Sequence, residues 1–170
     1  MANLIAFAGY AREGKDAAAM RLINLGWQRI AFGDIIKRQI DSLVQQHLGF
    51  SAFTENDSQK KQIRPILEQW GEVNYDGVMK EFFDSLPNYA VNTRLVRLRE
   101  AKEWIKRGGI ILRIRRPGVE PATEWERTRL QELYDGGVIH DTIINDSSID
   151  VLWDRVGRFA AVGDAYLQTR

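Results

Sequence analysis

A glycine-rich loop near the N-terminus constrains the fold of this chain more than any other feature. Residues 4–8, LIAFA, form an uninterrupted apolar run, and residues 9–16, GYAREGKD, follow directly. The run predicts a short buried strand, and the next segment has the G-x-x-x-x-G-K spacing of a phosphate-binding loop. Gly9 permits a sharp turn off the strand, and Gly14 lets the backbone approach an anion closely. The segment therefore predicts a strand, a phosphate-binding loop and a helix in succession.

The side chains of the same loop indicate how a phosphate group would be bound. Main-chain N–H groups and the helix N-terminus present partial positive charge to phosphate oxygens. Lys15 is expected to contact the terminal phosphates as a mobile point charge. Asp16 stands where a hydroxyl normally binds magnesium, and a carboxylate can hold Mg²⁺ directly or through water. In the alternative interpretation the segment is an ordinary loop, and Asp16 only complements the helix dipole.

Strands and helices alternate along the rest of the chain. Apolar runs predict strands over residues 4–8, 27–32, 89–91, 110–114 and 138–144. Apolar spacing of three and four residues predicts helices over residues 16–25, 33–47, 74–86, 95–106 and 124–134, and from 148 onward. Another helix follows the polar loop 49–57 and is expected to restart at Pro65. This order predicts an α/β fold with a parallel sheet covered on both faces and ligands at the carboxyl ends of its strands.

Composition narrows the class of protein. The chain has 170 residues, no cysteine, 24 basic and 23 acidic residues, and a formal net charge of +1. This length predicts a single domain over 1–170, and the lack of cysteine excludes disulfides and thiolate metal sites. The charge balance predicts no stable nucleic-acid partner. No apolar run approaches the roughly 20 residues of a membrane helix and no signal peptide is visible, so we expect no membrane partner and a cytoplasmic location.

Several short stretches, taken in order, resemble the deoxynucleoside monophosphate kinases of the bacteriophage type, within the adenylate-kinase-like P-loop kinases. They are GKD at 14–16, FGDIIK at 32–37, Arg64 with LEQWG at 67–71, NTR at 92–94, EA at 100–101, GG at 108–109, RRPG at 115–118 and IIND at 143–146. One position departs from the family pattern, because Asn92 stands where the family commonly has Asp. The segment between Arg94 and Glu100 is also longer than in the commonest form.

The resemblance implies both a fold and an activity. The fold is a P-loop NTPase-like, three-layer α/β/α domain with a five-stranded parallel sheet. A helical insertion over about residues 34–86 would bind the nucleoside monophosphate (NMP), and a short lid would span about residues 115–125. The activity is transfer of a phosphoryl group from ATP, with Mg²⁺, to a (deoxy)nucleoside 5′-monophosphate to give the diphosphate. A viral source would place this reaction in the host cytoplasm.

The resemblance also assigns residues to the donor nucleotide. The implied ATP-binding residues are Gly9, Ala11, Arg12, Glu13, Gly14, Lys15, Asp16, Ala17 and Asn145. Asp16 is the implied metal ligand. Asn145 ends the last predicted strand, where its amide is expected to contact adenine. A role in a turn is the alternative for Asn145, because Asn-Asp pairs often form turns.

Arginines are expected around the acceptor and the transferred group, because the planar fork of arginine matches phosphate oxygens. The implied NMP-binding residues are Asp34, Lys37, Arg64, Trp70 and Arg94, and the implied catalytic residues are Lys15, Arg94, Arg115 and Arg116. Most of them have a structural alternative. These alternatives are a helix N-cap for Asp34, a surface helix position for Arg64, a core position for Trp70, an ion pair with Glu100 for Arg94, and a solvated basic cluster for Arg113, Arg115 and Arg116.

Two other functions stay open at this level. The loop would serve equally in a kinase for another small acceptor, such as a nucleoside or a metabolite. The altered metal environment of Asp16 and Asn92 would favour a non-catalytic nucleotide-binding module on a retained scaffold. The five tryptophans suit a core or a homodimer interface alike, so the oligomeric state is open as well.

Overall fold

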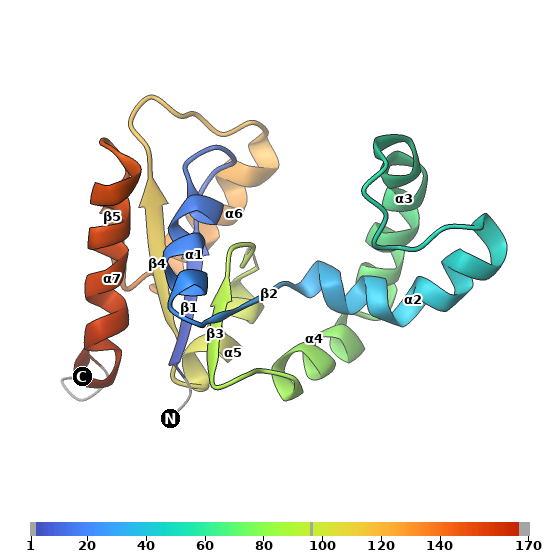
Figure 1. Cartoon of the computed structure of the whole chain (residues 1–170), viewed down its shortest axis with the longest axis horizontal. Coiled ribbons are helices and arrows are strands. Elements are labelled where there is room, and N and C mark those ends of the chain that lie inside the picture. Colours follow the sequence, from blue (N-terminus) through green and yellow to red (C-terminus); the bar gives the residue numbers. More distant parts are fainter. Residues whose placement is uncertain (1–2, 96, 167–170) are drawn as a thin grey trace. The chain divides into compact units, whose positions relative to one another are not determined.

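The structure, a computed structural model, describes residues 3–95 and 97–166, and within them five parallel strands form one sheet (Figure 1). The strands are β1 (Asn3–Ala8), β2 (Gln28–Ile30), β3 (Tyr89–Asn92), β4 (Ile110–Arg115) and β5 (Asp141–Ile144). Their order is β2-β3-β1-β4-β5, so β1 lies at the centre and pairs with β3 on one side and β4 on the other. Parallel strands need crossover connections, which the intervening helices supply.

Helices cover both faces of this sheet. The helices α1 (Lys15–Asn24) and α7 (Ile149–Tyr166) pack on one face, and α5 (Leu98–Lys106) and α6 (Glu124–Asp135) lie on the other (Figure 1). The first face buries an apolar core made by the sheet, α1 and α7. Its members include Phe7, Leu22, Val91, Leu112, Ile114, Ile143, Leu152 and Val156. The predicted three-layer α/β/α fold with a five-stranded parallel sheet is therefore confirmed.

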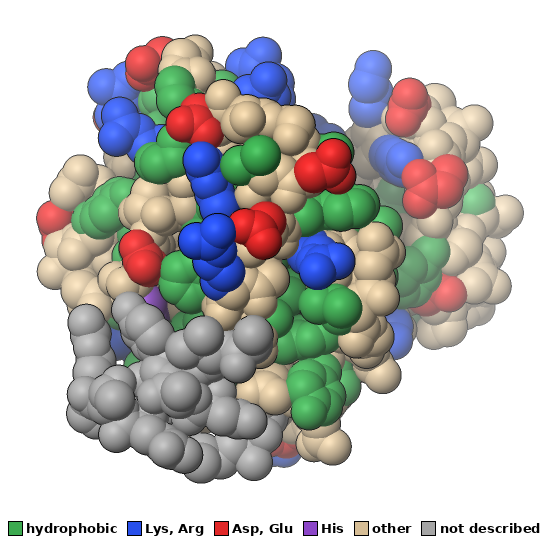
Figure 2. All heavy atoms as spheres, turned by 60° about the vertical axis from the view of Figure 1, so that its left-hand side comes forward, with side chains coloured by type: hydrophobic (Ala, Val, Ile, Leu, Met, Phe, Trp, Pro, Cys, Tyr) green, Lys and Arg blue, Asp and Glu red, His purple; other side chains and the backbone are tan. Residues whose placement is uncertain are grey.

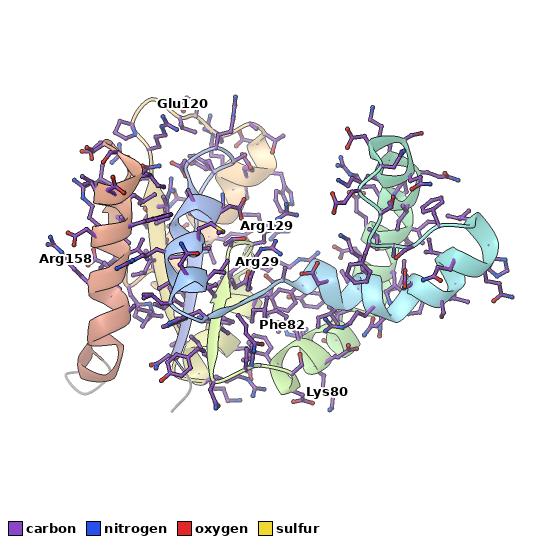
Figure 3. All side chains as sticks on the ribbon, in the orientation of Figure 1. Arg29, Lys80, Phe82, Glu120, Arg129 and Arg158 are labelled. Atoms are coloured by element: carbon purple, nitrogen blue, oxygen red, sulfur yellow. The ribbon has the colours of Figure 1, made fainter. Side chains whose placement is uncertain are left out.

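The chain divides into two compact units, which we describe separately. The sheet unit consists of the described residues of 1–30 and 87–170, and the helical unit is Ala31–Leu86. The helical unit contains α2 (Phe32–Leu48), α3 (Asp57–Val73) and α4 (Tyr75–Asp84). Its aromatic centre is the stack of Phe32 on Phe82, with ring centroids 3.8 Å apart, and Phe82 is drawn on α4 in Figure 3. A second apolar cluster joins Ile40 and Ile63 between α2 and α3.

Proline does not interrupt α3, so the predicted restart at Pro65 is wrong. The helix begins earlier, where the Asn56 side chain accepts hydrogen bonds from the main-chain N–H groups of Ser58 and Gln59. It then continues through Pro65 to Val73. Pro65 lies on an exposed face, where water can satisfy the carbonyl that proline deprives of its N–H partner.

Several other predicted boundaries also shift. The strand β2 is shorter than predicted, because Trp27 turns into the core and α2 already begins at Phe32. Asp34 is not the N-cap of α2, because Ala31 holds that position and Asp34 lies within the first turn. The helix α5 begins at Leu98 rather than 95, where the Glu100 carboxylate accepts from the Arg97 main-chain N–H. Side-chain capping thus outweighs apolar periodicity at that helix start.

The surface on the α7 side carries charges of both signs. Figure 2 turns this side toward the reader and shows acidic and basic side chains interspersed. Arg158 pairs with Asp154 at 2.7 Å, and Arg155 pairs with Asp146 at 2.8 Å. Among the described helices, none combines the length and the apolar character needed to cross a bilayer.

Candidate phosphate-binding site

The glycine loop joins β1 to α1 at the carboxyl end of the central strand. Gly9 and Gly14 have φ angles of 147° and 98°, which L side chains rarely adopt. A Cβ at Gly9 would lie 2.7 Å from the Ile114 carbonyl oxygen, and one at Gly14 would collide with Asn145 Nδ2. Both glycines are therefore required by close approach as well as by backbone conformation.

Lys15 is the first residue of α1, and its side chain folds back over the loop. Lys15 Nζ donates to the carbonyl oxygens of Gly9 at 2.9 Å and Tyr10 at 2.7 Å. Burial lowers the pKa of Lys15 below its ordinary value, and the nearby carboxylates, Glu13 first among them, oppose that shift. The ammonium group is thus held inside the loop, where it can exchange carbonyl oxygens for phosphate oxygens.

A buried ion pair lies directly beneath the loop. Glu13 and Arg113 are only 1% and 3% exposed. The guanidinium donates through two nitrogens to the two carboxylate oxygens, with Arg113 Nη2 2.7 Å from Glu13 Oε1. The Tyr10 main-chain N–H also donates to the Glu13 carboxylate, and the Tyr10 ring lies 5.2 Å from the guanidinium. Strand β4 therefore holds the loop through side chains that are 100 residues apart in the sequence.

Two further side chains contact the loop from later parts of the chain. Asn145 follows β5, and its Nδ2 donates to the Glu13 carbonyl oxygen at 2.9 Å. Glu126, in the first turn of α6, accepts from the main-chain N–H groups of Ala11 at 3.1 Å and Ala122 at 2.9 Å. In this structure Asn145 therefore braces the loop, and its predicted contact with adenine stays a prediction.

Asp16 supplies the only acidic side chain in the first turn of α1 and is exposed. The described residues contain no group of three or more His, Cys, Asp or Glu side chains arranged to hold a metal ion. The single carboxylate of Asp16 fits Mg²⁺, which commonly takes one or two carboxylates together with substrate phosphates and water. It does not resemble the all-protein cages of structural metal sites.

Three of the predicted cations emerge at the same edge of the sheet as the loop. Arg94 follows β3, Arg115 ends β4 and Arg116 follows it, and all three are exposed. Because β3 and β4 are the two neighbours of β1, their carboxyl ends flank the glycine loop. The fold thus brings these arginines and Lys15 to one edge, as expected for ligands of a parallel sheet.

The end of β3 also buries two polar groups. Asn92 Oδ1 accepts from the Arg94 main-chain N–H at 2.8 Å. Within residues 3–95 and 97–166, Asn92 Nδ2 and Thr93 Oγ1 have no hydrogen-bond partner. Buried polar groups of this kind normally have a partner, so the end of β3 is a place where ordered water or a ligand atom would be stabilised.

The other predicted acceptor residues belong to the helical unit. Asp34 and Lys37 lie on α2, and Lys37 Nζ is 5.4 Å from the centre of the Phe53 ring. Arg64 and Trp70 are exposed on α3, and Trp70 Nε1 donates to a glutamine of α2 at 2.9 Å. The side chain of Trp70 is 36% exposed, which excludes a fully buried core position. Their role in binding an acceptor stays a prediction.

Sequence reasoning missed two of the side chains that hold the loop. The solvated basic cluster offered as an alternative is wrong for Arg113, which is buried in β4. A signal was present, because an arginine inside the apolar run ILRIR needs an acidic partner if it is buried. Glu126 was not singled out, since nothing local connects it to a loop 115 residues away.

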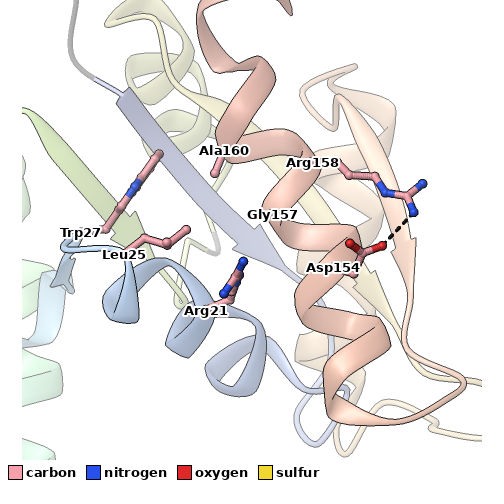
Figure 4. Close-up of a pocket in the computed structure, with 7 residues that line it drawn as sticks. All are labelled: Arg21, Leu25, Trp27, Asp154, Gly157, Arg158 and Ala160. Carbon is pink, nitrogen blue, oxygen red and sulfur yellow. Dashed lines mark hydrogen bonds and ion pairs between the residues drawn. The ribbon is translucent and has the colours of Figure 1, made fainter.

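One cavity lies elsewhere in the sheet unit, between the C-terminal half of α1 and α7 (Figure 4). Its volume is about 490 Å³. It is lined by Arg21, Leu25, Trp27, Asp154, Gly157, Arg158 and Ala160. Arg21 lies in the last turn of α1, whereas Lys15 begins that helix, so this cavity is separate from the phosphate loop.

Comparison with known proteins adds a likeness in fold. No family model matches the chain, and no curated protein matches it. Dephospho-CoA kinase from Campylobacter jejuni is 15% identical, with a TM-score of 0.48, over 94% of this chain and 96% of that one. Shikimate kinase from Aquifex aeolicus vf5 is 15% identical, with a TM-score of 0.49, over 95% of this chain and 98% of that one. The assignment of a P-loop α/β/α fold rests on the strand order and the loop after the central strand.

Proposed function

We propose that the protein is a P-loop phosphotransferase that moves the terminal phosphoryl group of ATP to a (deoxy)nucleoside 5′-monophosphate. One observation carries the proposal. Lys15 Nζ is held within a braced glycine loop, at the sheet edge from which Arg94, Arg115 and Arg116 emerge. A lysine and several arginines at one edge suit a reaction that depends on positioning and on neutralising phosphate charge.

On the donor side, the loop N–H groups and the helix N-terminus would bind the ATP phosphates. Lys15 would leave the carbonyl oxygens of Gly9 and Tyr10 and contact the terminal phosphates. Asp16 would hold Mg²⁺, which supplies further neutralisation of phosphate charge when bound. Arg115 and Arg116, at the start of the predicted lid, would stabilise the charge on the transferred group.

On the acceptor side, Arg94 and Arg64 would bind the monophosphate, each through the planar fork that matches phosphate oxygens. The attacking phosphate oxygen is already ionised near neutral pH, so the reaction needs no strong general base. The choice of a nucleotide acceptor is supported by the likeness of residues 32–37, 64–71 and 92–94 to the phage-type kinases.

A screen of acceptors tests the proposal. Purified protein is incubated with ATP, Mg²⁺ and each ribo- or deoxyribonucleoside 5′-monophosphate, and diphosphate formation is measured by chromatography. The same panel contains nucleosides without phosphate, and Lys15→Met serves as the inactive control. Diphosphate from at least one monophosphate is expected. Phosphorylation only of a nucleoside would reassign the acceptor, and ATP binding with no product would refute a nucleotide acceptor.

A further inference from the structure

We propose that Glu13 and Arg113 are positioning residues that fix the phosphate loop in its ATP-binding conformation and hold the first residues of the predicted lid in place. The inference rests on the proposed function, because it concerns the same nucleotide site. Neither side chain touches substrate in this role. They act through the main chain of the loop and through the residues that follow β4.

The Glu13 carboxylate connects several segments of the chain. It accepts from the Tyr10 main-chain N–H within the loop and from the Arg113 guanidinium of β4. The Arg116 main-chain N–H lies 3.4 Å from Glu13 Oε1, at the first residue beyond β4. The main-chain carbonyl of Glu13 also accepts from Asn145 at the end of β5. One residue therefore ties the loop to the ends of two strands.

Stability alone does not account for such a pair. Removing two charges from water carries a large desolvation cost, and a buried ion pair often stabilises a protein no more than apolar residues of similar size. The pair instead fixes geometry, because a bidentate guanidinium-carboxylate contact permits one relative orientation of the two side chains. Here that orientation sets the path of the loop around Gly9, whose missing Cβ leaves room for the guanidinium.

The pair also keeps the site attractive to phosphate. Glu13 lies two residues before Lys15 and interacts electrostatically with it. An uncompensated carboxylate there would repel the ATP phosphates, and Arg113 neutralises it from below the loop. Replacing Arg113 alone should therefore weaken ATP binding more than replacing both members with apolar residues.

The test separates positioning from mere stability. Three variants are compared with the wild type: Arg113→Met, the double variant Glu13→Leu with Arg113→Met, and Leu133→Ala as a control. Leu133 is a buried residue of α6, seven positions beyond Glu126, the residue of that helix that accepts a hydrogen bond from the loop. Each is measured by thermal unfolding and by calorimetric titration with ATP and Mg²⁺.

We expect the double variant to unfold at a temperature closer to the wild type than Arg113→Met does, yet to bind ATP about tenfold more weakly or worse, because misplacing binding groups by about 1 Å suffices for such losses. Leu133→Ala should lose thermal stability and keep its ATP affinity. Wild-type ATP affinity in the folded double variant would overturn the inference, as would an equal loss of affinity in Leu133→Ala. If the double variant does not fold, Glu13→Gln, which removes the charge and keeps the shape, is judged by the same two readouts.

These readouts also separate this inference from the proposed function. ATP affinity is measured without an acceptor, so the absence of diphosphate product would refute the proposed reaction and leave this comparison intact. A wild-type protein that does not bind ATP would refute both.

Discussion

One ion pair of the sheet unit and one of the helical unit differ in burial and in the distance along the chain that they span. In the sheet unit, Glu13 and Arg113 are buried and pair across 100 residues of sequence. In the helical unit, Lys80 and Asp84 pair at 2.6 Å one helical turn apart, with side chains 80% and 54% exposed. Exposed pairs of this kind contribute little to stability, whereas a buried bidentate pair fixes geometry.

This difference indicates which part of the molecule is preorganised. The phosphate loop is held by a buried ion pair with β4, by Glu126 of α6 and by Asn145, which follows β5. The predicted acceptor residues Arg64 and Trp70 are exposed on α3, where arginine retains rotamer freedom. We therefore expect changes in the phosphate loop and in the side chains that hold it to alter ATP binding and turnover, and changes at Arg64 to alter only the use of the acceptor.

The largest effect is expected from Lys15→Met. Turnover should fall by about 10³-fold or more, because an aligned positive charge at the transferred phosphate is lost.

The Lys15→Met variant should also unfold at a higher temperature than the wild type. Because burial lowers the pKa of Lys15, the folded protein binds its proton less tightly than the unfolded chain does. Stability therefore rises with pH between the lowered pKa and 10.5, and protonated Lys15 opposes folding below that range. Turnover and thermal unfolding at pH 7 check both; retained turnover would contradict the donor site.

Gly14→Ala should produce the next largest effect. The new methyl group would face Asn145 Nδ2 at a φ of 98°, so either the loop or the Asn145 side chain that braces it must move. We expect ATP affinity to fall by about tenfold or more. Gly26→Ala is the matched control, because Gly26 has a φ of 90° and open space around it. Both variants should lose stability through backbone strain, about 1–3 kcal/mol each. An equal loss of ATP affinity in both would indicate that strain, and not the close approach to Asn145, is responsible.

Arg64→Gln tests the helical unit. Losing a charged hydrogen bond to the acceptor phosphate is worth about 1.5–3 kcal/mol, which corresponds to an increase of about tenfold or more in the KM for the monophosphate. The KM for ATP and the unfolding temperature should stay unchanged, because Arg64 is exposed. Lys61→Gln, an exposed cation on the same helix, is the control and should leave all three values unchanged. A similar increase in the KM for ATP would contradict the proposal that Arg64 of the helical unit affects only the use of the acceptor.

The smallest effect concerns the loop after α2. The Asp41 carboxylate accepts from Ser51 Oγ at 2.8 Å and from the Ala52 main-chain N–H at 2.7 Å. These hydrogen bonds, that of Ser51 first, lower the pKa of Asp41 below its ordinary value of 3.8. Its contribution to stability is therefore present above that value and is lost as the pH falls through the lowered pKa. Asp41→Asn should unfold at a slightly lower temperature than the wild type at pH 7, and the gap should close in strong acid. A gap that does not change with pH would exclude this role of the charge.

Local patterns, each confined to its own segment of the sequence, were sufficient to predict much of the fold. The apolar runs predicted every strand of the described sheet, although β2 and β5 are shorter than predicted. The restart at Pro65 was wrong because an exposed proline can be accommodated where water satisfies the free carbonyl. The alternative of an N-cap role for Asp34 was wrong because α2 begins three residues earlier than that role requires. Local rules therefore identified the elements and misplaced some of their ends.

What the sequence by itself determined is the phosphate loop and the order of strands and helices, because both depend on neighbouring residues and on apolar periodicity. Only the tertiary structure decided how that loop is held. The partners of Glu13, Ala11 and Gly14 lie in β4, in α6 and after β5, at least 100 residues away in the chain. A buried charge requires a partner, but which residue supplies it depends on the order in which the strands join the sheet.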